Sequence, residues 1–559
     1  RRSARDISNI VVDQPGIIFS AQNLSAIVYN WGQFLDHDID LTPEYEEEYE
    51  PIQIPTDETL FTMEIPFFRS EFYNLPNDGL PREQLNVITA WIDGSNVYGS
   101  EDERADWLRT HTDGKLKTSA GNLLPFNTLD GEYASAVDTT APSTAGADAN
   151  GKMWVAGDVR VGEQVGLTTL HTLFVREHNR ICDELIAAGL TDDDAIYQEA
   201  RKKVVALIQK ITYQEFLPAL GVSLPAYTGY DSSVNPNISN LFSAAAYRLG
   251  HTMVVDSVRM LDNDCNPVGD TLVSLVEAFF NPEIIRNYDI DYFLKGLTVE
   301  VQYEVDPYIV PELRDFLFSD PNTSPVVGGL DLAAANIQRG RDHGLPDYNS
   351  IREYFLGAKA TSFADITSDS MVNARLVQAS NGDLDEIDPW VGFVSEDLVS
   401  GTSLGPTLHA IMEDQFGRLR DGDSFYYESY LTGDDLTEVN ATTLSDIVMR
   451  NTGLSGLEAN IMYADIDCDG TTSTGISTPE FALQIKVFPN PTTGLLHVKW
   501  EDPSLSIANF SVLNVRGQEV VRDRAFAGQI DLSDLPTGIY SILLNTNQGL
   551  AIKRIVLTD

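Results

Sequence analysis

The sequence has few cysteines and few basic residues for its length. Its three cysteines, Cys182, Cys265 and Cys468, are far apart and include no CxxC pair. An odd number at such spacing predicts neither a disulfide framework nor a zinc site. Lys and Arg total 37 against 84 Asp and Glu, which gives a net charge of −47. Because so acidic a surface repels phosphate groups and anionic lipid, neither nucleic acid nor a membrane surface is an expected partner.

Long hydrophobic runs are absent as well. No stretch of about 18 apolar residues occurs, so no membrane-spanning helix is predicted. The first ten residues, RRSARDISNI, have no signal-peptide pattern, and the chain is therefore expected to be a processed or trimmed form. What the sequence does have is 43% hydrophobic and 22% charged residues, a composition typical of folded domains. A length of 559 residues predicts two or more domains.

Residues 1–464 are predicted to form a mainly α-helical domain with little β structure. Apolar residues recur at helical spacing, with Gly and Pro as stop signals, in four segments: 167–189, 193–221, 238–255 and 405–420. Residues 465–484 are small, polar and rich in Gly, Ser and Thr, which predicts a linker. Residues 485–559 contain short alternating runs such as LLHVKW and YSILLN, separated by turn signals such as PNPTTG and LPTG. This pattern predicts a small all-β sandwich.

The segment WGQFLDHDIDLTP (residues 31–43) places one histidine among three acidic residues. In a helix, the side chains at positions 33, 36, 37 and 40 share one face, while Asp38 points elsewhere. Such a face suits a polar pocket better than a core. The alternative is a solvated helix end that carries an acidic cluster.

His251 lies in AAAYRLGHTMVV, an apolar stretch whose small residues allow something bulky to approach closely. A lone histidine on such a helix is most often a core residue. Arg248 lies one turn earlier on the same face, however, and a buried arginine needs an anionic partner. A haem would supply iron for the histidine and propionates for the arginine.

The remaining histidines and one charged pair each allow two interpretations. Arg160 and Glu163, spaced i, i+3 at a predicted helix start, form either a surface ion pair or an inward-facing pair. His171 and His178, seven apart on one helix, form either a metal pair or structural hydrogen bonds. Structural or surface positions are predicted for the rest: His111, His343, His409 and His497.

Taken together, four motifs resemble the animal-type haem peroxidases of the peroxidase–cyclooxygenase superfamily, the family of lactoperoxidase and myeloperoxidase: WGQFLDHDIDLTPE, DVRVGEQ, YRLGHT and NIQRGRDHGLP. The resemblance continues in LNVITAWIDGSNVYGS, LHTLFVREHNR, QFGRLRDGDSFYYE and NTGLSGLEANIMY, and so spans about residues 3–463. It implies that hydrogen peroxide oxidises a bound haem and that a ferryl intermediate then oxidises halides, thiocyanate or phenolic donors.

The resemblance also implies roles for individual residues on the two sides of the haem. On the distal side, His37 would be the acid–base catalyst, Arg160 would stabilise charge as the O–O bond breaks, and Gln33 would line the pocket. On the proximal side, His251 would bind the iron, and Asn336 would accept a hydrogen bond from its other ring nitrogen. Propionate contacts are implied for Arg248 and Arg339, with Asp40 and Thr42 nearby.

Two further features of the family concern covalent links and calcium. Asp36 and Glu163 match the two carboxylates that form ester bonds to the haem. The family's third link needs a methionine, and Gln164 stands there, so a lactoperoxidase-like haem with two esters is expected. Asp38 matches a calcium ligand, and the other ligands would come from one loop: Thr89, the Trp91 carbonyl, Asp93 and Ser95. Two departures stand out, since three cysteines cannot reproduce the disulfides of vertebrate members, and the family usually has more chain before RRSARDIS.

The C-terminal segment has a resemblance of its own. VFPNPTTGLLHV, VLNVRGQEV, DLSDLPTGIYSILL and KRIVL, within residues 487–557, resemble the type A sorting domain of the bacterial type IX secretion system. That implies contact with the secretion machinery and a secreted or cell-surface location. The alternative is a carbohydrate- or surface-binding β-module.

Two other functions are weighed against a peroxidase. Fatty-acid oxygenases of the same superfamily use a tyrosyl radical three residues before the proximal histidine. That position is Arg248 here, and Tyr247 next to it should point elsewhere on the helix. A catalytically silent adhesion or matrix protein should have lost His37, Arg160 or His251, and all three are present.

Overall fold

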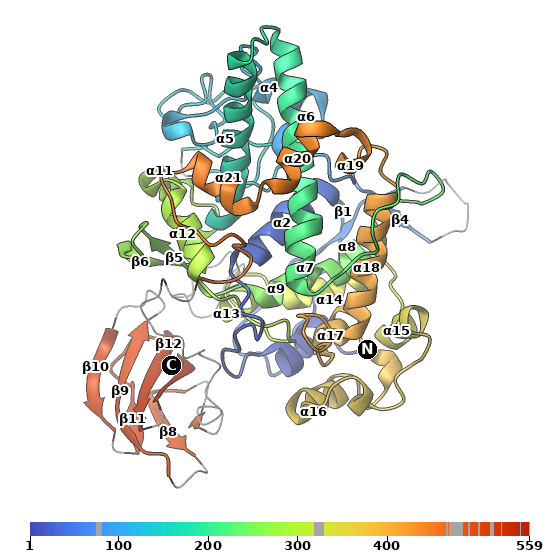
Figure 1. The fold of residues 1–559 in the computed structure, drawn as a ribbon. Helices are drawn as coiled ribbons and strands as arrows, with labels where there is room; N and C mark the ends of the chain where they lie inside the picture. Colours follow the sequence, from blue (N-terminus) through green and yellow to red (C-terminus); the bar gives the residue numbers. More distant parts are fainter. Residues whose placement is uncertain are drawn as a thin grey trace.

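The structure is a computed structural model of the chain. It describes residues 1–73, 81–148, 150–317, 329–465 and 468 and, in the C-terminal part, 485–489, 492–500, 504–514, 519–526, 528–547 and 549–557. In these residues a mainly helical unit is followed by an all-β unit, as predicted (Figure 1). The predicted linker lies outside the described residues apart from Asp465 and Cys468. None of the described helices is both long and apolar enough to cross a membrane.

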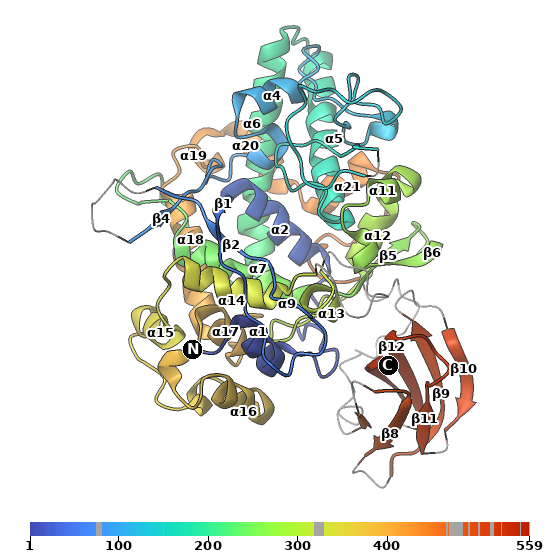
Figure 2. The same ribbon diagram turned by 180° about the vertical axis from the view of Figure 1, so that it is seen from behind.

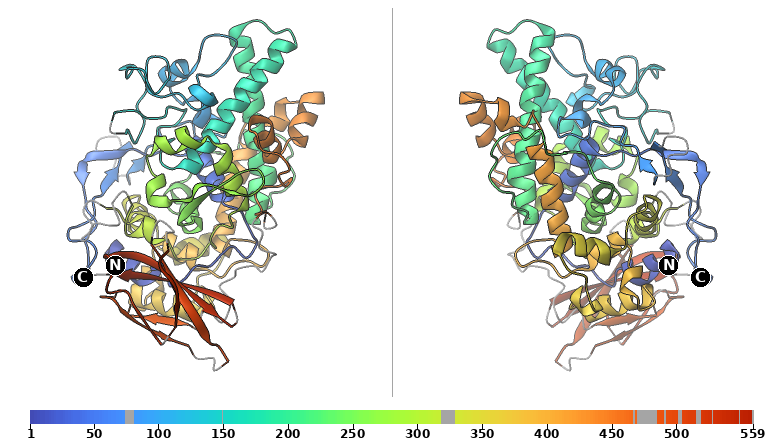
Figure 3. Two further views of the ribbon diagram at one scale, coloured as in Figure 1. Left: turned by 90° about the vertical axis from the view of Figure 1, so that its left-hand side faces the viewer. Right: turned by 90° about the vertical axis from the view of Figure 1, so that its right-hand side faces the viewer.

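Three long helices form the frame of the helical unit: α2 (Ile27–Ile39), α5 (Val165–Ala187) and α6 (Asp193–Ile211). The side views in Figure 3 show α5 and α6 running side by side. Helix α2 packs on α5 through aromatic rings, with the Phe34 and Phe174 centroids 5.1 Å apart and those of Trp31 and Phe174 5.7 Å apart. These fully buried rings fix the face that α2 turns toward the rest of the unit.

Two further segments were predicted as single helices and differ in continuity. The segment 193–221 is continuous, through α6, a π-helical turn at Thr212–Phe216 and α7 (Leu217–Leu220), and it ends at Gly221. The segment 238–255 is broken into α8 (Asn240–Ala244), a 3-10 turn η4 (Ala246–Leu249) and α9 (Gly250–Met253). The break lies at Ala245, whose φ of −142° is not helical. Periodicity alone could not reveal it, because the apolar spacing runs on through the break.

Apart from α18 (Pro406–Asp421), the other helices are shorter than α2, and many begin at a side-chain cap. Asp331 caps α14 (Leu332–Asp342), which lies against strand β2 (Phe68–Ser70), as the reverse view shows (Figure 2). The remaining elements are α1 (Ala4–Ile7), η1 (Ser8–Val12), α3 (Ser95–Tyr98), α4 (Asp102–Leu108), η2 (Ala120–Asn122), α10 (Leu275–Ala278), α11 (Pro282–Tyr288), α12 (Asp291–Val299), α13 (Pro311–Arg314), α15 (Tyr348–Leu356), η5 (Phe363–Asp365), α16 (Ser370–Ala379), η6 (Leu384–Glu386), α17 (Pro389–Ser395), α18 (Pro406–Asp421), α19 (Tyr427–Tyr430), α20 (Gly433–Ala441) and α21 (Leu444–Asn451).

Strands are scarce in the helical unit and form antiparallel pairs. The pairs are β1 (Glu44–Tyr49) with β2 (Phe68–Ser70), β3 (Phe72–Tyr73) with β4 (Glu83–Gln84), and β5 (Ser257–Leu261) with β6 (Pro267–Ser274).

The C-terminal unit is a two-sheet sandwich with its own apolar core, as predicted. One sheet has the order β10-β9-β12-β13 and the other β11-β8-β7. The pairing of β12 with β13 runs in register from Gly538↔Leu557 to Thr546↔Gly549. The strand bounds are β7 (Lys486–Phe488), β8 (Leu495–Lys499), β9 (Ile507–Asn514), β10 (Glu519–Ala525), β11 (Gln529–Asp531), β12 (Gly538–Thr546) and β13 (Gly549–Leu557).

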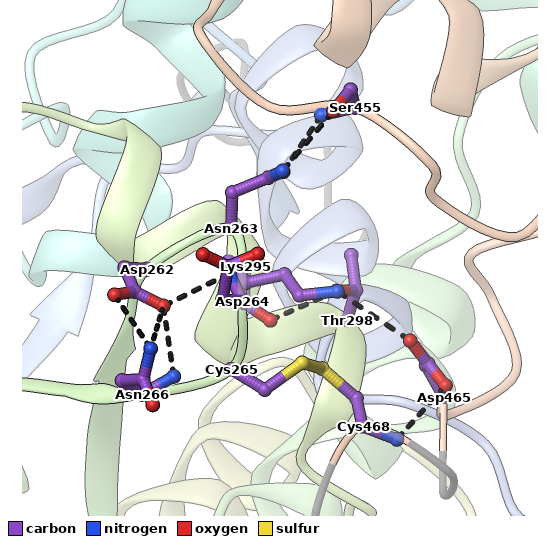
Figure 4. The surroundings of a disulfide bond; sticks show 10 residues. All are labelled: Asp262, Asn263, Asp264, Cys265, Asn266, Lys295, Thr298, Ser455, Asp465 and Cys468. Carbon is purple, nitrogen blue, oxygen red and sulfur yellow. Dashed lines mark hydrogen bonds and ion pairs between the residues drawn. A yellow bond between two sulfur atoms is a disulfide. The ribbon is translucent and has the colours of Figure 1, made fainter.

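The cysteines differ from the sequence-based expectation, because Cys265 and Cys468 form a disulfide (Figure 4). Their Cα atoms are 5.7 Å apart although 203 residues separate them in sequence. Cys265 lies in the turn between β5 and β6, and Cys468 follows Asp465, whose backbone N–H donates to the Thr298 carbonyl at 2.9 Å. Pairing over such a distance depends on tertiary structure, which the spacing could not reveal. Cys182 is free and buried.

Candidate functional site

The acidic face of α2 is directed into the protein. His37 is 1% exposed. Gln33 Nε2 donates to Glu163 Oε2 at 2.7 Å, and Asp36 Oδ2 accepts from Arg160 Nη1 at 3.0 Å. The backbone carbonyl of Asp40, at the helix end, accepts from Arg160 Nη2 at 2.9 Å. The face is therefore a polar pocket wall and not a solvated helix end.

Arg160 and Glu163 lie in a turn just before α5, and not in the helix itself as expected. The turn packs closely on the first residues of α3, since a Cβ on Gly157 would lie 2.2 Å from the Ser95 carbonyl oxygen. Their inward-facing interpretation holds, because both side chains meet α2.

Asp158 is a member of this site that the sequence analysis missed. Its carboxylate, 1% exposed, accepts from the Arg160 backbone N–H at 2.8 Å, from Nε at 2.9 Å and from Nη2 at 3.0 Å. Its Oδ1 also lies 3.5 Å from His37 Nδ1. The sequence signals were its place at the start of the motif DVRVGEQ and its position two residues before Arg160. In a turn, that spacing does not tell where a side chain points.

The second wall comes from the broken helix and α14. Asn336 Nδ2 lies 3.0 Å from His251 Nδ1, and its Oδ1 accepts from Arg248 Nη1 at 3.3 Å. Arg248 Nε donates to the Ser243 carbonyl across the helix break at 3.0 Å. Burial, together with the Arg248 charge, lowers the pKa of His251 to about 3, so the ring is neutral, which is the form that binds a metal.

The carboxylates of the site differ in ionisation. Burial raises the pKa of Asp36, and raises the pKa values of Glu163 and Asp40 to about 7 each, despite the Arg160 charge. Asp158 is also buried, but the charge and hydrogen bonds of Arg160 hold its pKa far below the usual range. Asp158 is thus firmly ionised, whereas burial shifts the other three carboxyl groups toward the neutral form.

Arg339 and Thr42, which the resemblance placed near the haem propionates, have fewer contacts with the other site residues. Arg339 Nη1 donates to the Phe68 carbonyl at 2.9 Å, and Nη2 pairs with Glu44 at 2.9 Å, so its guanidinium is engaged with β1 and β2. Its charge still helps to lower the pKa of Arg248, after the larger effect of burial. Thr42, two residues beyond the Arg160 contact at Asp40, is half-buried.

The predicted calcium ligands form a compact oxygen-rich cluster behind α2. Asp38 Oδ1 accepts from Ser95 Oγ at 2.7 Å, and Thr89 Oγ1 donates to Asp93 Oδ1 at 3.0 Å. The loop that follows Thr89 brings in Trp91, with its N–H 3.5 Å from Thr89 Oγ1. Burial and mutual repulsion with Asp93 raise the pKa of Asp38 well above its usual value. Among the described residues, no three His, Cys, Asp or Glu side chains gather as metal ligands, so hydroxyl and carbonyl oxygens would have to complete this set.

The two histidines of α5 have different surroundings. His171 Nδ1 lies 3.1 Å from the Asn96 carbonyl, and its ring centroid is 5.7 Å from that of His37. His178 lies between the Tyr98 hydroxyl and the Gly114 carbonyl, each 2.9 Å away. The predicted structural hydrogen bonds are present at both.

Comparison with known proteins assigns both parts of the chain. Residues 1–462 match the animal haem peroxidase family, and residues 486–558 match the secretion system C-terminal sorting domain. The chain belongs to the animal haem peroxidase family. The sorting domain indicates secretion and a surface location, in place of the alternative carbohydrate-binding module.

Relatives of this chain occur in several organisms. Peroxinectin A of Dictyostelium discoideum is 33% identical over 476 residues, which cover 81% of this chain and 86% of that protein. Lactoperoxidase of Mesocricetus auratus is 35% identical over 505 residues, which cover 82% of this chain and 69% of that protein. Among solved structures, peroxidase A of D. discoideum superposes with a TM-score of 0.73 at 31% identity, covering 82% of this chain and 91% of that one. A fatty acid α-dioxygenase of Arabidopsis thaliana, with a TM-score of 0.70 at 21% identity and coverage of 85% and 79%, shares the fold.

Proposed function

We propose that this chain is a secreted haem peroxidase that uses hydrogen peroxide to oxidise halides, thiocyanate or phenolic donors. The observation that supports this best is the pairing of two polar walls. One holds a buried neutral histidine beside an arginine, His37 and Arg160, and the other holds His251 on an amide from α14. The sorting domain supports export, through the type IX secretion machinery.

The residues present fit a haem. His251 is neutral and has one nitrogen engaged by Asn336, which leaves Nε2 for iron. With the Asn336 amide turned by 180°, its oxygen would accept from Nδ1–H, the arrangement that fixes a metal-bound imidazole. Arg248 Nη1 would then no longer have Asn336 Oδ1 as its acceptor. Arg248 is half-buried and has no carboxylate in hydrogen-bond contact among the described residues, which suits a propionate. Arg339 would meet the second propionate, with Asp40 and Thr42 nearby, only by exchanging its contact with Glu44. When bound, the haem supplies an iron that takes up the oxidising equivalents of peroxide.

The distal residues would then move protons and stabilise charge. His37 would accept a proton from bound peroxide and return it to the departing oxygen, so that water leaves. Arg160, held by two carboxylates, presents its positive charge where negative charge develops as the O–O bond breaks. Gln33 borders this space and would hold a water or a small anion.

Asp36 and Glu163 would form ester bonds with the haem. Both carboxyl groups keep accessible surface, and burial raises the pKa of each, so the site is a better environment for an uncharged ester than for a carboxylate. Gln164 turns away to donate to Asn30 Oδ1 at 2.6 Å, in keeping with the absence of a third link. Calcium would occupy the oxygen cluster of Asp38 and Asp93, where its charge relieves the repulsion between two buried carboxylates.

The alternatives receive less support. The position three residues before His251 holds Arg248, which donates to Asn336, and the neighbouring Tyr247 stacks on Phe242 with centroids 4.6 Å apart. No tyrosine therefore takes the place that an oxygenase radical needs. A silent adhesion protein would have no need to keep His37, Arg160 and His251 in their contacts.

The test is the visible spectrum of the protein supplied with haem, recorded before and after one equivalent of hydrogen peroxide. We expect a Soret band that changes with peroxide and recovers when bromide, thiocyanate or guaiacol is added. A Soret band that does not respond to peroxide, or no haem uptake, would overturn the proposal. The three donors, tested at equal concentration, rank the substrates.

A further inference from the structure

Two buried polar groups, Asp158 and His171, lie beside the His37 ring. Asp158 Oδ1 lies 3.5 Å from His37 Nδ1, too far for a strong hydrogen bond but close enough for an electrostatic contact. The His171 ring lies at a centroid distance of 5.7 Å, tilted by 42°. His37 Nδ1 and His171 Nε2 are both buried and have no hydrogen-bond partner among the described residues.

Both of these neighbours are hydrogen-bond acceptors. Asp158 is ionised, because three hydrogen bonds from Arg160 stabilise its charge, and an ionised carboxylate only accepts. His171 Nδ1 faces the Asn96 carbonyl at 3.1 Å, and a carbonyl also only accepts. The proton of the neutral His171 ring must therefore be on Nδ1, which leaves Nε2 as an acceptor.

We propose that Asp158 and His171 are positioning residues that keep the proton of neutral His37 on Nδ1, and so leave its Nε2 free to accept a proton from peroxide. The inference rests on the proposed peroxidase function and adds to it which residues make His37 Nε2 the proton acceptor. A neutral imidazole carries one N–H proton. A hydrogen-bond acceptor beside Nδ1 keeps that proton on Nδ1, and Nε2 is then the unprotonated nitrogen that can act as a base. Either neighbour can receive that proton's hydrogen bond, directly or through one water between the two unpartnered nitrogens.

Asp158 also holds the Arg160 side chain in place. Arg160 is shared by Asp158, which accepts three of its hydrogen bonds, and Asp36, which accepts one. Once Asp36 becomes an ester it has no negative charge left to offer. Asp158, fully buried behind the arginine, is then the remaining anion in contact with it, and it fixes the guanidinium beside His37.

The experiment compares Asp158→Asn with Asp158→Glu in the haem-loaded protein. The asparagine amide can donate to His37 Nδ1 and shift the ring proton to Nε2, whereas glutamate keeps an acceptor and a charge. Two rates are measured per bound haem by stopped flow: the reaction with hydrogen peroxide, and the binding of hydrogen cyanide, whose proton also needs a distal base. We expect both rates to fall by about 10²-fold or more in Asp158→Asn and to recover by at least about tenfold in Asp158→Glu.

His171→Phe and Glu177→Gln complete the set. His171→Phe removes one acceptor and leaves Asp158, so a smaller fall in the same two rates is expected. Glu177→Gln removes a buried carboxylate on the same helix that pairs with Arg180 and Arg450, away from the site, and both rates should stay unchanged. Haem content and melting temperature are recorded for every variant, because a purely structural role would lower these and spare the rates per haem.

The outcomes separate the two proposals. If Asp158→Asn reacts with peroxide and cyanide within about threefold of the parent, or Asp158→Glu is as slow as Asp158→Asn while His171→Phe is unaffected, the positioning role is wrong. If Asp158→Asn cannot hold haem, the rates of Asp158→Glu and His171→Phe decide whether the positioning role is right. A Soret band of the unmutated protein that does not change with peroxide would overturn the peroxidase function itself.

Discussion

The Asn336 side chain lies 3.0 Å from His251 Nδ1 and at the same time accepts from Arg248 at 3.3 Å. One amide therefore joins the proposed iron ligand to a proposed propionate partner. Because α14 is capped at Asp331 and carries this amide on its buried face, a separate element sets the orientation of the imidazole.

Asn336→Leu is expected to weaken binding of added haem by about 10–100-fold, because the imidazole loses the partner that orients it. The measurement is a titration of haem-free protein followed at the Soret band, before any peroxide is added. Asn349→Leu removes a buried amide in α15 and is the control. Equal affinities in the two variants would contradict the role of Asn336.

His37→Ala should keep haem and lose most of the peroxide reaction, by about 10²–10⁴-fold, because the proposed distal base is lost. The rate is measured by stopped flow with the protein in excess of peroxide. His111→Ala, at a histidine with 54% exposed side chain, should behave like the parent. Unchanged turnover in His37→Ala would sink the acid–base assignment.

Asp36→Ala and Glu163→Ala should each leave one ester link, and the double variant none. After turnover with peroxide, haem is extracted with acidic acetone, and the protein is stained for haem on a denaturing gel. We expect full retention in the parent, reduced retention in each single variant and complete extraction from the double variant. Haem that leaves the parent completely would refute the covalent attachment.

Asp93→Asn should have opposite effects with and without calcium. In metal-free protein the substitution relieves repulsion with Asp38 and should raise the melting temperature, whereas in calcium it removes a ligand and should lower it. Melting curves in chelator and in millimolar calcium test this. The same sign under both conditions would argue against a calcium site.

The Cys265–Cys468 disulfide should stabilise the helical unit. The disulfide closes a loop with a sequence separation of 203, and removing it with Cys265→Ser/Cys468→Ser should lower the free energy of unfolding by about 2–5 kcal/mol. The measurement is the unfolding transition of the helical unit with and without reductant. Reductant should affect the parent and leave the double variant unchanged, and a parent insensitive to reductant would contradict the prediction.

The sequence by itself determined the fold class, the family and the identity of most residues at the site. Helical spacing placed Gln33, Asp36 and His37 on one face of α2, because period and face are local properties. The alternating runs after residue 485 likewise predicted the sandwich, since register and turns are encoded over a few residues.

Tertiary structure alone decided the features that depend on distant contacts. Asp158 joins the site because a turn of residues 157–164 folds onto α2, and its direction follows from packing and not from spacing. The break at Ala245, the engagement of Arg339 with Glu44 and the disulfide across 203 residues are of the same kind. Each is set by what the chain meets on folding, because local sequence preferences are weak beside the free energy of burying and pairing side chains.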